Sequence, residues 1–429
     1  MSDVKLITPS SRLKGSVSPP GDKSISHRAV MLASLADGES QIQNLLPAED
    51  CFSTVEAFKA MGVPISLSPT GAVNVQGKGM KGLAQPAKEL YLGNSGTTMR
   101  LLLGILAGQS YIATLTGDES LSRRPMKRVT EPLREMGAKI QGPEDANFPP
   151  ITIKGGELHG IRYNNEIASA QVKSAILLAG LYADGESEVK EVVSSRDHME
   201  RMLTLFGAKF KKKGSVCLAG KTETLKPQRM DIPGDISSAA FFIVGALMVP
   251  GSEVLIRNVL LNPTRTGFLE VLRKMGAQIS VENPREQWEP IGDIRVKSSK
   301  LQGVKIGKRM IPSLIDELPV LMVACSLAEG ESEIRGAGEL RVKETDRIKA
   351  MCANLTRLGV KVKEYPDGCR IHGRLDLEGG IVESFGDHRI AMAMAIAGIA
   401  CKKELKIQAS DCVAVSYPRF FEDLDRLRY

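Results

Sequence analysis

The sequence predicts an α/β protein of two domains, each built from three β-α-β-α-β-β repeats. Three observations carry this prediction: an apolar helix with a polar start recurs six times, a second and amphipathic helix follows most of these, and a short alternating strand comes next. A chain of 429 residues is long enough for two or three domains. Repeats of about 70 residues suit supersecondary elements of this kind.

The apolar helices all begin at turns rich in small and polar residues. They are expected in "DKSISHRAVMLASLADGES", "GNSGTTMRLLLGILAGQS", "SAQVKSAILLAGLYADGES", "DISSAAFFIVGALMVPGSE", "IDELPVLMVACSLAEGES" and "DHRIAMAMAIAGIACKKE". Such residues are ordinary helix caps. They also leave backbone N–H groups free beside the positive end of the helix dipole, which is an arrangement that binds anions.

The second helices end in phrases that are nearly identical. Five of these phrases are "AFKAMGVPI", "PLREMGAKI", "MLTLFGAKF", "VLRKMGAQI" and "NLTRLGVKV", while the sixth repeat stops at "FFEDLDRLRY". The glycine fits the C′ position after a helix, and the alternation that follows predicts a strand.

The two domains are expected to exchange chain segments. The stretch "KPQRMDIPGDISS", just before the fourth repeat, contains prolines and a glycine that predict a change in chain direction. The opening "SSRLKGSVSPPGDKS" contains the same Pro-Gly-Asp sequence. Both are therefore interpreted as crossovers. The expected domains are residues 1–20 with 231–429, and residues 21–230. Parallel helices would gather their N-terminal ends at one rim of each domain, and the cleft between the domains is the expected active site.

Composition narrows the class of protein. The net charge of +7 favours acidic partners, but the 4% aromatic content with one Trp is too low for base-stacking platforms, so no nucleic-acid partner is expected. The densest basic run, Lys211-Lys212-Lys213, is expected in an exposed hairpin. Seven cysteines without a CxxC pair, and the lack of a signal peptide, indicate a reducing cytoplasm. Scattered histidines predict no metal site, and the apolar runs are too short for a membrane span.

Charged and polar residues gather at the helix starts and in three loops. Those at the starts are Lys23, Ser24, Arg28, Asn94, Gly96, Thr97, Arg100, Ser169, Gln171, Lys173, Asp235, Ser237, Asp316, Glu317, Asp387, His388 and Arg389. Those in the loops are Arg123, Arg124, Arg196, Lys343, Glu344 and Arg347. Each alone fits a cap or a solvated surface residue. Cations that stand at the starts of equivalent helices in successive repeats, and so face one cleft, would repel one another unless an anionic ligand neutralises them. Asp316 and Glu344 are then the candidates for proton transfer.

Eight motifs, in order from about residue 8 to the C-terminus, closely resemble those of the 5-enolpyruvylshikimate-3-phosphate synthase family. They are "PGDKSISHRA", "LGNSGTTMR", "RPMKRV", "SAQVKSAILLAGL", "SRDHMERML", "IDELPVL", "LRVKETDRI" and "DHRIAMA". The resemblance implies two inside-out α/β domains that close over the substrates. It also implies transfer of the enolpyruvyl group of phosphoenolpyruvate to the 5-hydroxyl of shikimate 3-phosphate, through a tetrahedral intermediate, in chorismate and aromatic amino-acid biosynthesis.

The resemblance further implies roles for matching residues. Those expected on shikimate 3-phosphate are Lys23, Ser24, Arg28, Ser169, Ala170 through its backbone, Gln171, Arg196, Asp316 and Lys343. Those expected on phosphoenolpyruvate, or on analogues such as glyphosate, are Lys23, Asn94, Gly96, Arg124, Gln171, Arg347 and Arg389. The implied catalytic residues are Asp316 as acceptor of the hydroxyl proton, Glu344 as donor to the methylene carbon, and Lys23 in support. Val415 and Ser416 stand where some members carry a lysine, so no role is assigned there.

Two other functions stay open. A related enolpyruvyl transferase acts on UDP-N-acetylglucosamine, but its loop cysteine has no counterpart in "GDESLSRRPM". A non-catalytic phospho-ligand-binding protein would have no need for both Asp316 and Glu344. We expect an enzyme that uses no cofactor or metal, takes two small phosphorylated substrates and acts as a monomer.

Overall fold

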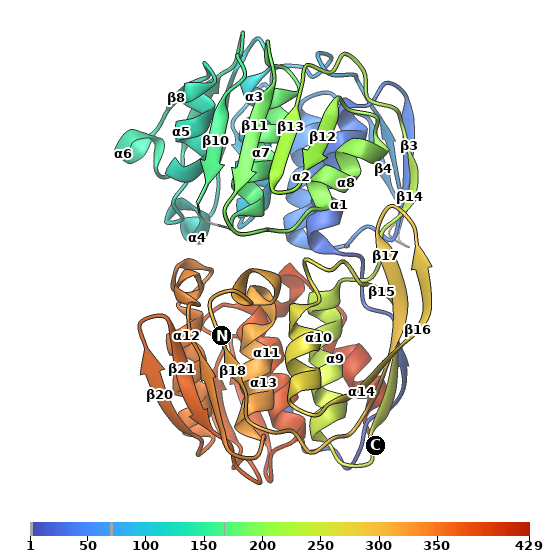
Figure 1. Ribbon diagram of the computed structural model, residues 1–429, viewed down its shortest axis with the longest axis vertical. Coiled ribbons are helices and arrows are strands. Elements are labelled where there is room, and N and C mark those ends of the chain that lie inside the picture. Colours follow the sequence, from blue (N-terminus) through green and yellow to red (C-terminus); the bar gives the residue numbers. More distant parts are fainter. Residues whose placement is uncertain (1–2, 69–71, 167) are drawn as a thin grey trace. The chain divides into compact units, whose positions relative to one another are not determined.

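The computed structural model describes residues 3–68, 72–166 and 168–429 (Figure 1). The chain divides into two compact units. We call Gly21–Ile232 the continuous unit, and Met1–Pro20 with Pro233–Tyr429 the discontinuous unit, of which residues 1 and 2 lie outside the described residues. The continuous unit ends at Ile232 rather than at residue 230, because Asp231 still pairs with Gln43 in one of its sheets.

The continuous unit contains three four-stranded sheets. The first is β14 (Arg229–Asp231), β3 (Glu39–Gln43), β5 (Val73–Gln76) and β4 (Ile65–Leu67). The second is β6 (Leu90–Tyr91), β7 (Ile112–Thr116), β9 (Ile151–Lys154) and β8 (Lys139–Gln141). The third is β10 (Arg162–Asn165), β11 (Ser187–Glu191), β13 (Val216–Ala219) and β12 (Phe210–Lys213). In each sheet the first two strands run parallel and the other neighbours antiparallel.

The discontinuous unit has two four-stranded sheets and one of three strands. One four-stranded sheet is β16 (Gln278–Glu286), β17 (Pro290–Lys297), β15 (Glu253–Leu260) and β2 (Lys14–Val17). The other is β18 (Lys305–Ile306), β19 (Glu331–Ile334), β21 (Gly368–His372) and β20 (Lys361–Tyr365). The small sheet is β1 (Val4–Ile7), β23 (Leu405–Gln408) and β22 (Gly380–Glu383). β1 pairs antiparallel with β23, at the position that the second strand of the hairpin occupies in the other sheets.

Two strands each pair within a sheet of one unit, although the helix that follows them in the chain belongs to the other unit. β2 lies just before the helix that starts at Lys23, yet it runs parallel to β15, with Val17 opposite Ile256. β14 lies just before the helix that starts at Ile236, yet it runs parallel to β3. Each strand is followed by a Pro-Gly-Asp segment, at residues 20–22 and 233–235. This repeated segment therefore marks the two points where the chain changes unit.

Six inner helices, one in each repeat, form the cores of the units. They are α1 (Lys23–Leu35), α3 (Gly96–Ala107), α7 (Ala170–Gly180), α9 (Ile236–Met248), α11 (Leu318–Ser326) and α13 (His388–Ile399). In α9 every residue from Ile236 to Leu247 is buried, as expected of a helix that is apolar on all sides. α3 packs on α7, and α11 on α13. In Figure 1 the sheet of β10–β13 covers α7 on the outer side, so the helices lie inside and the strands outside.

A second helix follows each inner one and packs at the outside. These are α2 (Glu49–Ala60), α5 (Lys127–Glu135), α8 (His198–Leu205), α10 (Gly267–Lys274), α12 (Arg347–Arg357) and α14 (Phe420–Leu427). The five glycines of the repeated phrase have φ between +74° and +109°, as the C′ position requires; they are Gly62, Gly137, Gly207, Gly276 and Gly359. The order β6–α3–β7–α5–β8–β9 confirms the predicted β-α-β-α-β-β repeat.

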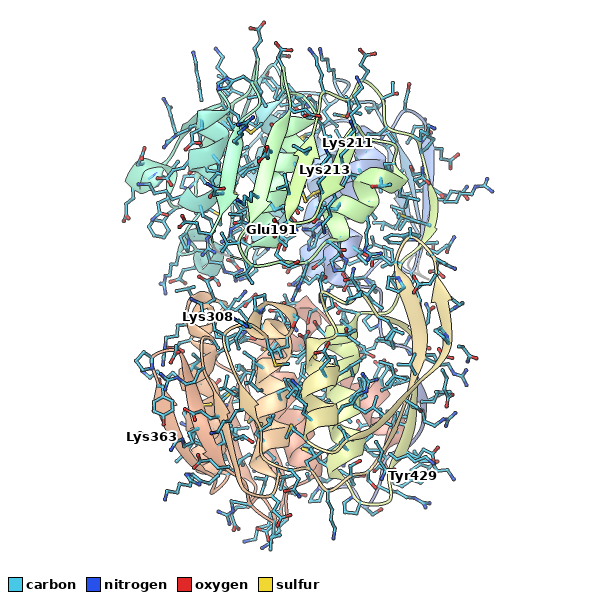
Figure 2. The ribbon with its side chains drawn as sticks, viewed as in Figure 1. Glu191, Lys211, Lys213, Lys308, Lys363 and Tyr429 are labelled. Carbon is cyan, nitrogen blue, oxygen red and sulfur yellow. The ribbon has the colours of Figure 1, made fainter. Side chains whose placement is uncertain are left out.

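Short helices complete the chain. They are α4 (Glu119–Ser122), α6 (Pro143–Ala146), η1 (Ile311–Ser313), η2 (Ile315–Glu317), η3 (Gly338–Val342) and η4 (Ser410–Val415). Lys211 and Lys213 lie along β12, exposed and next to the turn into β13, which confirms the predicted hairpin (Figure 2).

Candidate active site

In the continuous unit the inner helices begin at side-chain caps. Asp22 accepts from the backbone N–H of Ile25 at the start of α1, and Ser95 and Ser169 do the same for α3 and α7. These caps leave N–H groups of the first turns directed out of the helices, beside the positive ends of their dipoles. Lys23, Ser24, Gly96, Ala170 and Gln171 all lie in these first turns.

Arg28 links two of the helices. Its Nη1 donates to the carbonyl oxygen of Ser24 at 2.9 Å, and its Nη2 donates to Oγ of Ser174 on α7 at 2.9 Å. The residue is buried. A buried guanidinium is stable only with such partners, so the position of Arg28 is determined by both α1 and α7.

Two guanidinium groups converge on Gly96. Arg124 donates from Nη1 to the carbonyl oxygen of Asn94 at 3.2 Å and from Nη2 to Oγ of Ser120 at 3.1 Å, and Nη2 also contacts Oδ1 of Asn94. A Cβ atom on Gly96 would lie 3.1 Å from Nη1 of Arg100 and 3.4 Å from Nη1 of Arg124. The missing side chain therefore leaves room for both cations at the start of α3.

Gln171 joins α7 to α3. Its Oε1 accepts from Nη1 of Arg100 at 2.8 Å, and its Nε2 donates to Oγ1 of Thr97 at 3.0 Å. Arg100 was predicted among the charged residues at the helix starts, but without a role on either substrate. Arg100 follows Gly96 by one helical turn, so the two residues lie on the same face of α3, and this spacing indicates that Arg100 is at the site.

Lys23 forms an ion pair with Asp50 of α2. Sequence reasoning missed Asp50, because an acidic residue in the first turn of a helix is usually a solvated dipole partner. Behind this pair, His27 is fully buried, and its Nδ1 lies 2.7 Å from Oγ1 of Thr54. Burial, together with the positive charges of Lys23 and Arg28, holds the pKa of His27 well below its usual value.

The grouping of Lys173 with the rim residues was wrong. Its side chain is completely buried, and Nζ lies 2.9 Å from Oε2 of Glu191 and 2.6 Å from Oε1 of Glu200. Arg196, by contrast, is half-buried in the loop between β11 and α8.

In the discontinuous unit Arg347 is the centre of the predicted cluster. Its Nε donates to Oδ2 of Asp387 at 2.7 Å, its Nη2 to Oε2 of Glu344 at 2.6 Å, and its Nη1 to Oδ1 of Asp316 at 3.4 Å. Burial alone would lower the pKa of Arg347, but the three carboxylates outweigh it and raise that pKa. Arg389 donates to the carbonyl oxygen of Asp316 at 3.1 Å.

Other predicted positions in this unit are Lys343, in a loop, and Asp235, Ser237 and Glu317, which share one set of contacts. Lys343 directly follows η3 and is half-buried. Ser237 at the start of α9 donates to Oε1 of Glu317 and accepts from Nη2 of the buried Arg265 at 2.8 Å, and Arg265 also contacts Asp235 at 3.2 Å. Sequence reasoning missed Arg265, because nothing in its local sequence distinguishes it from a surface arginine.

In the continuous unit the structure thus brings cations to the starts of the inner helices. In the discontinuous unit Arg347, at the start of α12, contacts three carboxylates. A family model for EPSP synthase (3-phosphoshikimate 1-carboxyvinyltransferase) matches residues 7–424. The chain belongs to the EPSP synthase family.

Relatives in the EPSP synthase family match this chain over nearly its full length. A 3-phosphoshikimate 1-carboxyvinyltransferase of Desulforudis audaxviator (strain MP104C) is 53% identical and covers 98% of this chain and 99% of its own. One of Geobacillus kaustophilus (strain HTA426) is 50% identical and covers 99% of this chain and 100% of its own. A solved structure of EPSP synthase from Acinetobacter baumannii has a TM-score of 0.90 and 43% identity, over 100% of this chain and 98% of that one.

These comparisons confirm the α/β fold class that the repeats predicted and the two inside-out domains that the family resemblance implied, and they place the chain among transferases. Among the helices of the described residues, none has both the length and the apolar character that a membrane span requires.

Proposed function

We propose that this EPSP synthase family member transfers the enolpyruvyl group of phosphoenolpyruvate to the 5-hydroxyl of shikimate 3-phosphate and releases phosphate. The names and full-length similarity of its relatives support this assignment. The single observation that carries the chemistry is that Arg347 contacts both Asp316 and Glu344, the two candidates for proton transfer. If Arg347 binds phosphoenolpyruvate, its contacts place both carboxylates beside that substrate.

Shikimate 3-phosphate is assigned mainly to the continuous unit. Arg28 and Ser24 are proposed to hold its carboxylate, and Ser169, the backbone of Ala170 and Arg196 its 3-phosphate. The capped start of α7 supports the phosphate assignment, since a helix N-terminus favours phosphate. Lys343 is proposed to bind a ring hydroxyl, and Gln171 to lie beside both substrates.

Phosphoenolpyruvate is assigned to three arginines, Arg124, Arg347 and Arg389, together with Lys23 and the turn at Asn94 and Gly96. Guanidinium groups bind carboxylate and phosphate oxygens in pairs, which fixes their orientation. Arg124 and Arg347 are held by neighbouring oxygens in this structure.

The reaction proceeds by addition and elimination. Asp316, assisted by Lys23, accepts the proton of the 5-hydroxyl, whose oxygen bonds to carbon 2 of phosphoenolpyruvate while Glu344 protonates carbon 3. The tetrahedral intermediate then returns a proton from carbon 3 to the Glu344 carboxylate and expels phosphate, which restores the double bond. The arginines stabilise the carboxylate and phosphate charges throughout. We further propose that the protein acts in the cytoplasm as a monomer.

The test is to incubate the purified chain with phosphoenolpyruvate and either shikimate 3-phosphate or UDP-N-acetylglucosamine. We expect phosphate release with shikimate 3-phosphate, and a product whose mass equals the acceptor plus an enolpyruvyl group. Release with UDP-N-acetylglucosamine alone would reassign the acceptor. Binding of both substrates without any release would indicate a non-catalytic protein. Sedimentation of the same sample gives the oligomeric state.

A further inference from the structure

A buried lysine holds both ends of the loop that carries Arg196. Lys173 lies on α7, and its side chain has no exposed surface. Its Nζ contacts Glu191, the last residue of β11, at 2.9 Å and Glu200, in the first turn of α8, at 2.6 Å. These two carboxylates stand immediately before and shortly after the loop 192–197, and Figure 2 labels Glu191 at the end of its strand.

Glu191 also holds the middle of the loop. Its Oε1 accepts hydrogen bonds from the backbone N–H of Ser195 at 3.1 Å and from Oγ of Ser195, while its Oε2 contacts Lys173. In residues 192–197, all of which the structure describes, Ser195 is the one buried residue, and Val192 is 68% exposed. Ser195 directly precedes Arg196. Residues 192–194 are thus exposed, Ser195 is buried where Glu191 binds it, and Arg196 and Asp197 are half-buried.

These contacts connect the start of α7 with the loop of Arg196, and both are proposed to bind the 3-phosphate of the substrate. Lys173 lies one turn after Ser169 on α7, so it stands behind the helix start that is assigned to the 3-phosphate. The chain of contacts runs from α7 through Lys173 and Glu191 to Ser195, the neighbour of Arg196. Burial lowers the pKa of Lys173, but Glu200 and Glu191 outweigh burial and raise it, so the lysine stays charged.

A buried ion pair is weak evidence for stability, because well-packed apolar residues of similar volume often do as well or better. In some proteins, ionic groups retained in a core fix one conformation. Here both oxygens of Glu191 are used, one on the helix and one on the loop.

We propose that Lys173 and Glu191 are positioning residues for Arg196: they fix its loop against the start of α7 and thereby set the affinity for the 3-phosphate of the substrate. The proposal rests on the proposed function, in which Arg196 binds that phosphate. Neither residue touches the substrate. Their effect is therefore expected on phosphate recognition and not on the chemical step.

The experiment compares two ligands, shikimate 3-phosphate and shikimate, by calorimetry on the full chain. Glu191→Gln has one acceptor oxygen in place of two, so it cannot use separate oxygens to accept from Lys173 and from the backbone N–H of Ser195. We expect it to weaken shikimate 3-phosphate about 10- to 100-fold, the range for a lost hydrogen bond to a charged group. Shikimate should bind as it does to the unmodified chain, and kcat at saturating substrate should be retained.

A second variant and a control make the outcome independent of folding. Ser195→Ala removes the hydroxyl from the loop and should reproduce the loss, at smaller size. Ser40→Ala is the control, because it also removes the hydroxyl of a buried, hydrogen-bonded serine: Oγ of Ser40 accepts from the backbone N–H of Gln228 at 3.1 Å, elsewhere in the same unit. It should bind both ligands normally.

The double variant Glu191→Gln/Arg196→Ala separates positioning from general destabilisation. If Glu191 acts through Arg196, the double variant loses no more affinity for shikimate 3-phosphate than Arg196→Ala alone. Additive losses, or equal losses for both ligands, would overturn the positioning role and leave the proposed function intact. An Arg196→Ala variant that keeps full preference for the phosphorylated ligand would instead overturn the assignment of Arg196, and the positioning role with it.

Discussion

Arg347 and Asp387 are joined side by side in the core of the discontinuous unit, with Nε 2.7 Å from Oδ2 and Nη2 3.4 Å from Oδ1. Both side chains are buried. Oδ1 of Asp387 also accepts from the backbone N–H of Arg389 at 2.8 Å, so the same carboxylate caps α13. One side chain therefore positions two of the arginines assigned to phosphoenolpyruvate.

Asp387→Asn is expected to raise the KM for phosphoenolpyruvate about 10- to 100-fold, because it removes a charged partner of Arg347. Asparagine caps helices as well as aspartate does, so the start of α13 should be kept. The affinity for shikimate 3-phosphate alone should change little. Asp346→Asn is the control, since Asp346 caps α12 and pairs with Arg341 at 2.7 Å. The assignment of Arg347 fails if both variants give the same KM.

Gly96→Ala tests the turn at the start of α3. Its φ lies outside the left-handed region, so alanine causes no backbone strain, and the effect comes from a methyl group 3.1 Å from Arg100 and 3.4 Å from Arg124. We expect the substitution to lower the affinity for phosphoenolpyruvate and for glyphosate more than it lowers the affinity for shikimate 3-phosphate. Calorimetry measures all three affinities. Gly156→Ala is the control, since its methyl group would meet no atom within 4 Å. Equal losses for all three ligands would refute the assignment.

The repeats, the fold class and the helix starts could be predicted because they follow from interactions between residues close in the sequence. Caps act over two or three residues, and the C′ glycines such as Gly62 end a helix by their own backbone conformation. These rules need no knowledge of tertiary packing.

The ion pairs of the site could not be predicted in this way. Asp50 meets Lys23, and Asp387 meets Arg347, only because separate elements pack together. Lys173 was grouped with the rim for the same reason: its helix start was visible, but its direction toward β11 and α8 was not. A lone lysine in an otherwise apolar inner helix was nevertheless a signal, since a buried lysine needs carboxylate partners.

Asp316→Asn should lower kcat by about 10²–10⁴, the usual contribution of a general base. Binding of shikimate 3-phosphate should be retained, because Asn keeps the shape of the side chain and the backbone oxygen that accepts from Arg389. Asp293→Asn is the control in the same unit: Asp293 is also largely buried and accepts from Asn258 and Asn283. Rapid-quench measurement of a single turnover gives the chemical step directly. A normal rate there would remove Asp316 from the acid–base role.

His27 should make the protein less stable in acid. Because burial holds its folded-state pKa well below the usual value of about 6.5, the unfolded chain binds a proton below that pH that the folded chain does not. Stability is therefore full above about pH 6.5 and falls as the pH drops toward the folded-state pKa, by at most about 1.4 kcal/mol per pH unit. Urea unfolding at pH 7, 6 and 5 should show a smaller decrease for His27→Gln than for the unmodified chain. Thr54→Val removes the 2.7 Å partner of the ring but not its titration, so it should lower stability at every pH and keep the original slope. Identical slopes for all three proteins would show that His27 does not link folding to pH.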